Sequence, residues 1–203
     1  MGTDRSLDSG VHTGPAQLNQ TAEQAGINGE YHTVMRMAED FRKRGEILAI
    51  GDLLKSPPFS GFIDVTFLKG TSVSMCVCQN DDGVALRCLW NGSFEAMSMA
   101  LWQTLAKRTD CVFDVGAHSG IYSLIAWAGN PSGTTVSFEP FHLNFARLAV
   151  NLRANGFPLK TAINVAVSDQ AEVAPFATSS TPGYLTTGGN VVADQKGGEI
   201  PVV

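Results

Sequence analysis

A short apolar run at 111–115 leads directly into a turn with two glycines, Gly116 and Gly120. Such runs are typical of buried parallel strands, and the apolar pattern that returns at 121–124 has helical spacing. Glycine allows dihedrals that are closed to other residues and lets a ligand approach the backbone. A strand, a glycine turn and a helix start form a layout in which backbone N–H groups face an anionic or polar ligand. Asp114 ends the strand, where its carboxylate can hold an ammonium or a hydroxyl of that ligand.

The spacing of this loop is D-x-G-x-x-x-G, which is not the dinucleotide fingerprint G-x-G-x-x-G. The fingerprint would need glycines at 116, 118 and 121, where the chain has Gly116, His118 and Ile121. Ligands of open α/β sheets bind at the carboxyl ends of the strands, so the loop is in the right place for a cofactor. The alternative is a purely structural role, in which the two glycines only allow the chain to turn from the strand into the helix.

A second short apolar strand, Val136–Phe138, also ends in a carboxylate, that of Glu139. It lies one βαβ unit beyond the first strand. An acid at the end of the second strand can accept both ribose hydroxyls of an adenosine cofactor. The two strands therefore predict one adenosine site, shared between the glycine loop and Glu139.

The sequence of these segments resembles the FkbM-type family of S-adenosylmethionine-dependent methyltransferases over roughly 91–203. The resemblance rests on D-V-G-A-H-S-G-I-Y-S-L, then F-E-P, N-L-R-A-N-G and A-V-S-D. The family often has Asn where this chain has His118, and its members can approach the adenine at the position of Asp169. A surface turn is an equal alternative for Asp169. The resemblance implies S-adenosylmethionine as cofactor, bound by Asp114, Gly116, Ala117, His118, Gly120, Ile121, Tyr122, Glu139 and Asp169.

The implied fold class is α/β, with a Rossmann-like class I methyltransferase sheet that is cut short. A helix and a small antiparallel β-meander precede it. We expect a disordered segment at 1–29, the helix and meander at 30–92, and the cofactor-binding domain at 93–203, incomplete at its C-terminus. The family continues with further strands that pair beyond 111–115. Without them that strand has an open edge, so we expect the chain to self-associate.

Apolar spacing places the elements ahead of the sheet. A helix is predicted from Tyr31 to about Arg44, ending at Gly45, with a short second turn within 46–55. The period then changes to two, which predicts three strands carrying Ile63, Val65 and Phe67, then Val73, Met75 and Val77, then Val84, Leu86, Cys88 and Trp90.

The same spacing places the elements around the glycine loop. Ser93 is predicted to cap a helix with a core stripe of Phe94, Met97, Leu101 and Leu105. We interpret Glu95 first as a helix-dipole residue and second as a site residue. Ser119 is predicted to cap the helix at 121–129, and a further helix should end at Asn155-Gly156. A third strand follows with Ile163, Val165 and Val167, then a loop at 177–198 with a short strand at Val191-Val192, and a strand at 199–203.

Composition excludes several classes of function. The net charge of −5 disfavours a nucleic-acid partner. The sequence holds no run of 18 apolar residues, so no membrane span is expected, and the first residues lack the apolar region of a secretory signal. The four cysteines lack the spacing of a metal site, so we expect no metal and predict small buried thiols in a reducing cytoplasm.

The resemblance therefore implies a methyltransferase that transfers a methyl group to an oxygen of a small-molecule, glycan or lipid-like acceptor, and the composition predicts that it is cytoplasmic. No catalytic base is assigned, because a lone loop histidine such as His118 is more often a scaffold residue. Two alternatives stay open. One is a non-catalytic binding protein with a degenerate methyltransferase fold, and the other is an NAD-dependent oxidoreductase, against which the missing third glycine argues.

Overall fold

The structure is a computed structural model that describes residues 31–58, 60–67, 70–178, 185, 189–191 and 198–203. The predicted disordered segment at 1–29 and most of the predicted loop at 177–198 lie outside the described residues. Within them the fold is mixed α/β: a parallel three-stranded sheet interleaved with helices, and an antiparallel β-hairpin nearer the N-terminus.

The central sheet consists of β3 (Cys111–Val115), β4 (Thr134–Phe138) and β5 (Ala162–Ile163), which are parallel and lie in the order β3-β4-β5. Two helices, α6 (Ile121–Gly129) and α7 (His142–Ala154), connect consecutive strands. The predicted alternation of strand and helix is therefore confirmed. The predicted third strand is correct only at its start, because Val165 and Val167 lie beyond β5.

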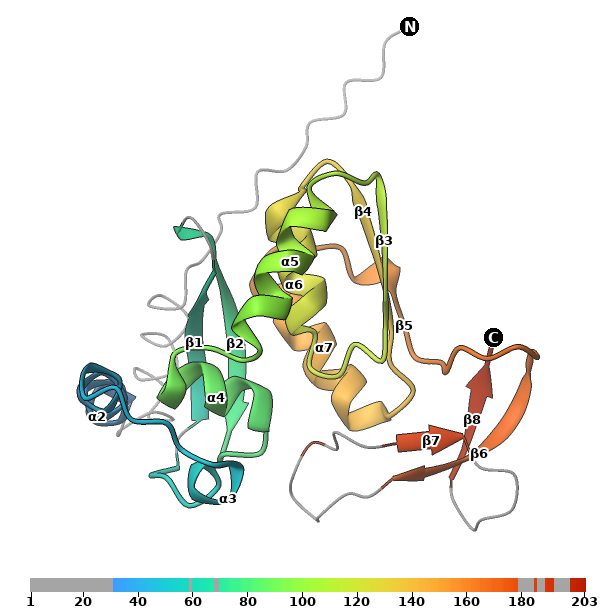
Figure 1. The fold of residues 1–203 in the computed structure, drawn as a ribbon. Coiled ribbons are helices and arrows are strands. Elements are labelled where there is room, and N and C mark those ends of the chain that lie inside the picture. Colours follow the sequence, from blue (N-terminus) through green and yellow to red (C-terminus); the bar gives the residue numbers. More distant parts are fainter. Residues whose placement is uncertain (1–30, 59, 68–69, 179–184, 186–188, 192–197) are drawn as a thin grey trace, which may run out of the picture.

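A layer of helices separates the sheet from the hairpin (Figure 1). The layer consists of α6, α7 and α5 (Ala96–Ala106). Its core is formed by fully buried leucine and isoleucine side chains, including Leu124 and Ile125 of α6 and Leu148 and Leu152 of α7. The same buried cluster continues into the hairpin, so the hairpin and the helices that cover the sheet share one core.

The hairpin pairs β1 (Ser60–Thr66) with β2 (Ser72–Cys78), and Ile63, Val65, Val73, Met75 and Val77 are buried as their alternation predicts. The predicted third strand of a meander is wrong, because those residues form the helix α4 (Gly83–Asn91). Asp82 caps α4 by accepting the N–H groups of Val84 and Ala85. A helix buried on several faces also shows apolar residues at every second position, which explains the error.

The helix α5 also differs from its prediction. It begins at Ala96 rather than after Ser93, and the Glu95 side chain makes no cap hydrogen bond. The predicted core stripe is wrong for three of its members, since Met97 is 89% exposed and Leu101 and Leu105 are exposed as well. The buried residues of α5 are Met99, Gln103 and Ala106. Because α5 is apolar on more than one face, spacing alone does not indicate which face packs on α6.

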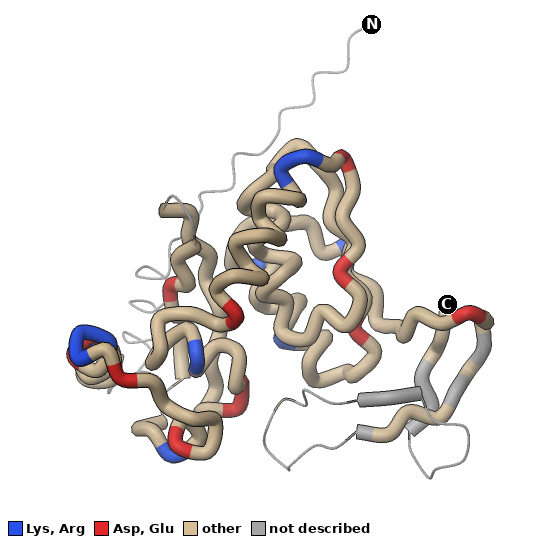
Figure 2. Tube along the Cα trace, viewed as in Figure 1, with Lys and Arg blue, Asp and Glu red and all other residues tan. Residues whose placement is uncertain are grey.

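The N-terminal helices follow their predictions. The helix α2 spans Tyr31–Lys43 and is followed by Gly45 at φ +71°, while α3 (Ile50–Leu53) is the short turn expected within 46–55. Figure 2 shows acidic and basic positions side by side on α2, where Lys43 Nζ lies 2.8 Å from Glu39 Oε1. Of the helices in the described ranges, none combines the length and the apolar character that crossing a membrane requires.

A second three-stranded sheet lies near the C-terminus and is antiparallel. It consists of β6 (Glu172–Thr178), β7 (Gly189–Val191) and β8 (Gly198–Val202), in the order β7-β6-β8. The predicted strand at 199–203 is confirmed, and β7 includes Val191 of the predicted short strand, while Val192 lies outside the described residues. The sequence did not predict β6, because Pro175 interrupts its pattern.

The prediction of buried thiols is wrong for three of the four cysteines. Only Cys88 is buried, whereas Cys76 is half-buried and Cys78 and Cys111 are exposed. For Cys76 and Cys78 the period-two pattern itself indicates this outcome, because it gives Val73, Met75 and Val77 to the core and the two cysteines to the opposite face of β2.

One face of the central sheet is apolar and bare. Asp114 of β3 points toward α6, so Phe113 and Val115 point to the opposite face, where they are 61% and 60% exposed. The Phe113 ring stacks on Phe138 of the neighbouring strand, with 6.3 Å between ring centroids. In the described part of the chain β3 pairs only with β4, so its other edge is open beside this face.

We therefore expect this chain to self-associate through β3 and its bare face. Replacing Phe113 by Lys should weaken the association about 10- to 150-fold, because burying a phenylalanine contributes about 1.5–3 kcal/mol. The matched control is Ile47→Lys, which places the same charge at an 82% exposed residue outside the sheet. Sedimentation equilibrium measures both variants. A wild-type chain that stays monomeric at every concentration would contradict the expectation.

Candidate functional site

The glycine loop joins the carboxyl end of β3 to the start of α6. Three of its residues have positive φ: Gly116 at +79°, His118 at +54° and Gly120 at +95°. The helix α6 begins directly after Gly120, which occupies the N-cap position without a side-chain cap. The predicted cap at Ser119 is therefore wrong. The left-handed turn at Gly120 accounts for this, because it ends the loop one residue later.

Most described amides of this loop are already used within the protein. The N–H groups of Gly116 and Ala117 donate to the carbonyl of Phe138 at 2.9 and 3.0 Å, and that of Gly120 donates to Ala117. The expectation that the N–H groups of these residues face a ligand is therefore wrong. What the loop offers at Gly116 is close approach to its backbone, since a Cβ at this residue would meet no heavy atom within 4 Å.

Glu139 lies against the glycine loop, as its place after β4 predicts. Its Oε2 accepts the N–H of His118 at 2.7 Å, and its Oε1 accepts the N–H of Phe141 at 2.9 Å. The side chain is only 4% exposed. The amide of Asn144 also donates to Oε1, at 3.4 Å. A carboxylate has about four acceptor positions, so these three donors leave capacity for about one further hydroxyl of a ligand. Glu139 thus joins the loop to the start of α7 and keeps acceptor capacity.

Asp114 lies beneath the loop and not on its surface. It is buried, and its Oδ2 accepts the hydroxyl of Ser123 at 2.6 Å, which in turn lies 2.6 Å from Ser137 Oγ. Burial raises the pKa of Asp114, and the hydrogen bond from Ser123 partly opposes that shift. The folded chain therefore binds this proton more tightly than the unfolded chain, and Asp114 costs stability as the pH rises above the ordinary aspartate range.

Tyr122 and Glu95 connect the loop helix to α5. The Tyr122 hydroxyl donates to Glu95 Oε2 at 2.6 Å, and Glu95 itself has a left-handed backbone at φ +44°. Partial burial, followed by the hydrogen bond to Glu95, raises the pKa of Tyr122 to about 12. This direct contact with Tyr122 supports the second interpretation of Glu95, as a residue near the candidate site.

His118 points one ring nitrogen at a protein partner and leaves the other without one. Its Nδ1 lies 3.1 Å from Ser119 Oγ, whereas Nε2 is buried and has no hydrogen-bond partner among the described residues. A buried polar atom without a partner costs stability. A polar ligand bound at the loop could supply the hydrogen-bond partner that Nε2 lacks, and it could occupy the open space beside Gly116.

The remaining predicted residues divide into two groups. Ala117, Gly120 and Ile121 are buried and shape the loop from within. Asp169 is exposed beyond β5, where it accepts a hydrogen bond from Ser168, and no contact in the described residues joins it to the loop.

Asn164 instead approaches the site. Its amide donates to the carbonyls of Glu139 and Pro140 at 2.7 and 3.0 Å. The sequence did not single it out, although an amide directly after the third strand is the signal that could have found it.

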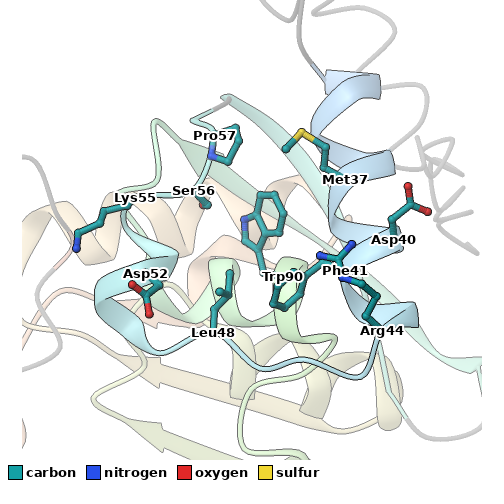
Figure 3. Close-up of a pocket in the computed structure, with 10 residues that line it drawn as sticks. All are labelled: Met37, Asp40, Phe41, Arg44, Leu48, Asp52, Lys55, Ser56, Pro57 and Trp90. Carbon is teal, nitrogen blue, oxygen red and sulfur yellow. The ribbon is translucent and has the colours of Figure 1, made fainter.

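The cavity in Figure 3 lies elsewhere, between α2, α3 and α4. It measures about 360 Å³ and shares no residue with the glycine loop; Met37, Asp40, Phe41, Arg44, Leu48, Asp52, Lys55, Ser56, Pro57 and Trp90 line it. Two basic and two acidic side chains face it, so its charges define no single ligand class. The described residues hold no cluster of three or more His, Cys, Asp and Glu side chains suited to a metal ion. We therefore place the candidate site at the glycine loop.

Comparisons of the chain with protein-family models, curated proteins and solved structures found no match. The candidate site therefore rests on the residues and contacts above.

The two loop glycines should differ in what they contribute to stability. A Cβ at Gly120 would overlap Leu148 Cδ1, whereas one at Gly116 meets open space, and both residues have positive φ. Gly116→Ala should cost about 1–2 kcal/mol from backbone strain alone. Gly120→Ala should cost about 2–5 kcal/mol, because overpacking adds about 1–3 kcal/mol. Urea unfolding measures both, and equal losses would contradict the predicted overlap.

Proposed function

We propose that this chain is an S-adenosylmethionine-dependent methyltransferase that acts on an oxygen of a small-molecule, glycan or lipid-like acceptor. The observation that carries the proposal is the 2.7 Å contact between Glu139 Oε2 and the His118 N–H. It brings together two of the four sequence segments on which the resemblance to FkbM-type methyltransferases rests, the glycine loop and F-E-P. They follow the neighbouring parallel strands β3 and β4 and lie at the carboxyl ends of these strands, where ligands of α/β proteins bind.

The finer fold assignment, a Rossmann-like class I methyltransferase sheet, belongs to the same proposal. In the resembled fold the strand equivalent to β3 is central, and later strands pair beyond it. The open edge of β3, its bare apolar face and the exposed residues Met97, Leu101 and Leu105 of α5 fit such an arrangement. Each of these apolar surfaces would be covered if further strands and helices packed there.

Each residue of the site has a proposed task. The backbone at Gly116 gives a ligand close approach, and Glu139 accepts from the ribose with the acceptor capacity that its three protein donors leave. His118 Nε2 offers one further polar contact. Asp114, Ser123 and Ser137 support the loop from below. When bound, S-adenosylmethionine supplies a methyl group already activated by its sulfonium, so the protein's principal contribution is to position the acceptor.

The proposal is tested at Glu139 with a matched control at Asp82. Each carboxylate is buried and accepts two backbone N–H groups, but only Glu139 lies at the glycine loop. Glu139→Gln and Asp82→Asn should therefore both lower the melting temperature. Only Glu139→Gln should weaken the binding of S-adenosylmethionine, by about 5- to 30-fold in the dissociation constant. The reason is that a charge-assisted hydrogen bond is stronger than a neutral one by about 1–2 kcal/mol.

Calorimetric titration provides the readout, with the demethylated product and NAD titrated in parallel. The variant should lose as much affinity for the demethylated product as for S-adenosylmethionine, because both ligands carry the same ribose. Unchanged affinity in a folded Glu139→Gln variant would leave Glu139 a purely structural role. Tighter binding of NAD would favour an oxidoreductase, and binding without turnover of any acceptor would favour a degenerate methyltransferase fold.

A further inference from the structure

Two cysteines on β2 lie together in a groove that is separate from the glycine loop. Cys76 and Cys78 are two residues apart on one strand, so they share a face, and their Sγ atoms are 3.9 Å apart. The groove measures about 370 Å³ and is otherwise lined by Asp81, Leu143, Ala146, Arg147, Val150 and Leu185. Cys78 is exposed and Cys76 half-buried, so solvent reaches the pair from the Cys78 side.

The charged groups around this pair are an ion pair that is itself largely buried. Arg147 donates to both carboxylate oxygens of Asp81 at 3.1 and 2.7 Å, and to the carbonyl of Cys76 at 2.9 Å. Since Arg147 and the N–H of Cys78 occupy the Asp81 carboxylate, the described residues that line the groove offer no free third ligand for a metal ion. The guanidinium also opposes a bound cation, whereas it favours a thiolate.

The two sulfurs are not equivalent. The S–H of Cys76 can donate to Cys78, and this hydrogen bond lowers the pKa of Cys78 to about 6, with Arg147 lowering it further while burial and Asp81 act in the opposite direction. The pKa of Cys76 is raised, first by the same hydrogen bond and then by burial. At neutral pH the pair therefore holds a thiolate at the exposed residue and a thiol at the shielded one.

We propose that Cys78 is a peroxide-reactive thiol and that Cys76 resolves its oxidised form to a disulfide within β2. The Cys78 thiolate attacks one oxygen of a hydroperoxide, so an S–O bond forms, the O–O bond breaks, and the leaving oxyanion takes up a proton. Cys76 Sγ then attacks the sulfenic sulfur, forming the S–S bond and releasing water with its own proton. The two thiols lose two electrons and the peroxide gains them.

The backbone around the pair suits this step. A disulfide needs about 2.05 Å between the sulfurs, so they must approach from 3.9 Å. Side-chain oxygens hold both backbones, since the N–H of Cys76 donates to Asn151 Oδ1 at 2.7 Å and the N–H of Cys78 donates to Asp81 Oδ1 at 3.1 Å. Cys78 is the last residue of β2 and precedes two residues with positive φ, Gln79 and Asn80, so the regular strand ends where the movement is needed.

The chain offers a clean assay. Trypsin cleavage after Lys69 and Arg87 releases residues 70–87, which contain Cys76 and Cys78 but neither Cys88 nor Cys111. Hydrogen peroxide should convert this peptide to a form lighter by two hydrogens. The Cys76→Ser variant should stop at a sulfenic acid on Cys78 that dimedone traps, and Cys78→Ser should give neither product. Cys111→Ser, which removes the other exposed thiol, should behave as the wild type does.

The rate gives a second, independent readout, best measured at pH 6. A thiol of pKa 6 holds about 150 times more thiolate there than an ordinary one of pKa 8.5, but lower basicity makes it about tenfold less nucleophilic. The folded chain should therefore react about tenfold faster than a synthetic peptide of residues 70–87. Equal rates in the two, or equal reactivity of Cys76→Ser and Cys78→Ser, would overturn the proposal.

Discussion

The side-chain amide of Asn151 on α7 holds the helix, the hairpin and the glycine loop together. Its Oδ1 accepts the N–H of Cys76 in the hairpin at 2.7 Å, and its Nδ2 donates to the carbonyl of Ser119 in the glycine loop at 2.8 Å. Asn155, which directly follows α7, both accepts from and donates to the backbone of Ser74 at 2.8 Å. A buried backbone group left unpaired costs about 1–3 kcal/mol. The edge of β2 is thus satisfied by a helix, where a strand would ordinarily pair.

This arrangement places the glycine loop between fixed supports. Leu148 packs directly against Gly120, Asn151 holds the carbonyl of Ser119, and Glu139 holds the N–H of His118. The hydrogen-bonded series of Asp114, Ser123 and Ser137 lies below. A loop held from so many sides keeps one shape, and such preorganisation lets a site bind a ligand without ordering itself first.

The sequence predicted the elements that depend on local rules. The glycine loop, the acid after β4 and the helices α2, α6 and α7 were found, because strand runs, helical spacing and glycine stops are local signals. It failed where burial decides. The residues of α4 alternate like a strand because the helix is buried on several faces, and the apolar stripe of α5 was assigned to the core although it is exposed.

The polar residues that hold the site together were harder still to predict. Asn151, Asn155 and Asn164 make their contacts with backbone groups up to 81 residues away along the chain. No local pattern encodes such a pairing. The sequence does not predict the orientation of the Gly116 and Ala117 amides for the same reason, since their acceptor is a carbonyl of the neighbouring strand β4. Sequence thus predicts which loop and which acid come together, whereas tertiary packing decides which of their atoms keep free hydrogen-bonding capacity.

We propose that the glycine loop and Glu139 form one cofactor site, and hydrogen–deuterium exchange with and without S-adenosylmethionine can locate that site along the chain. We expect slower exchange in two segments, 115–122 and 138–144, with little change in the hairpin. Their amides lie at the loop and at the start of α7, which Glu139 joins. Protection confined to the cavity around Trp90, or no protection at saturating cofactor, would contradict it.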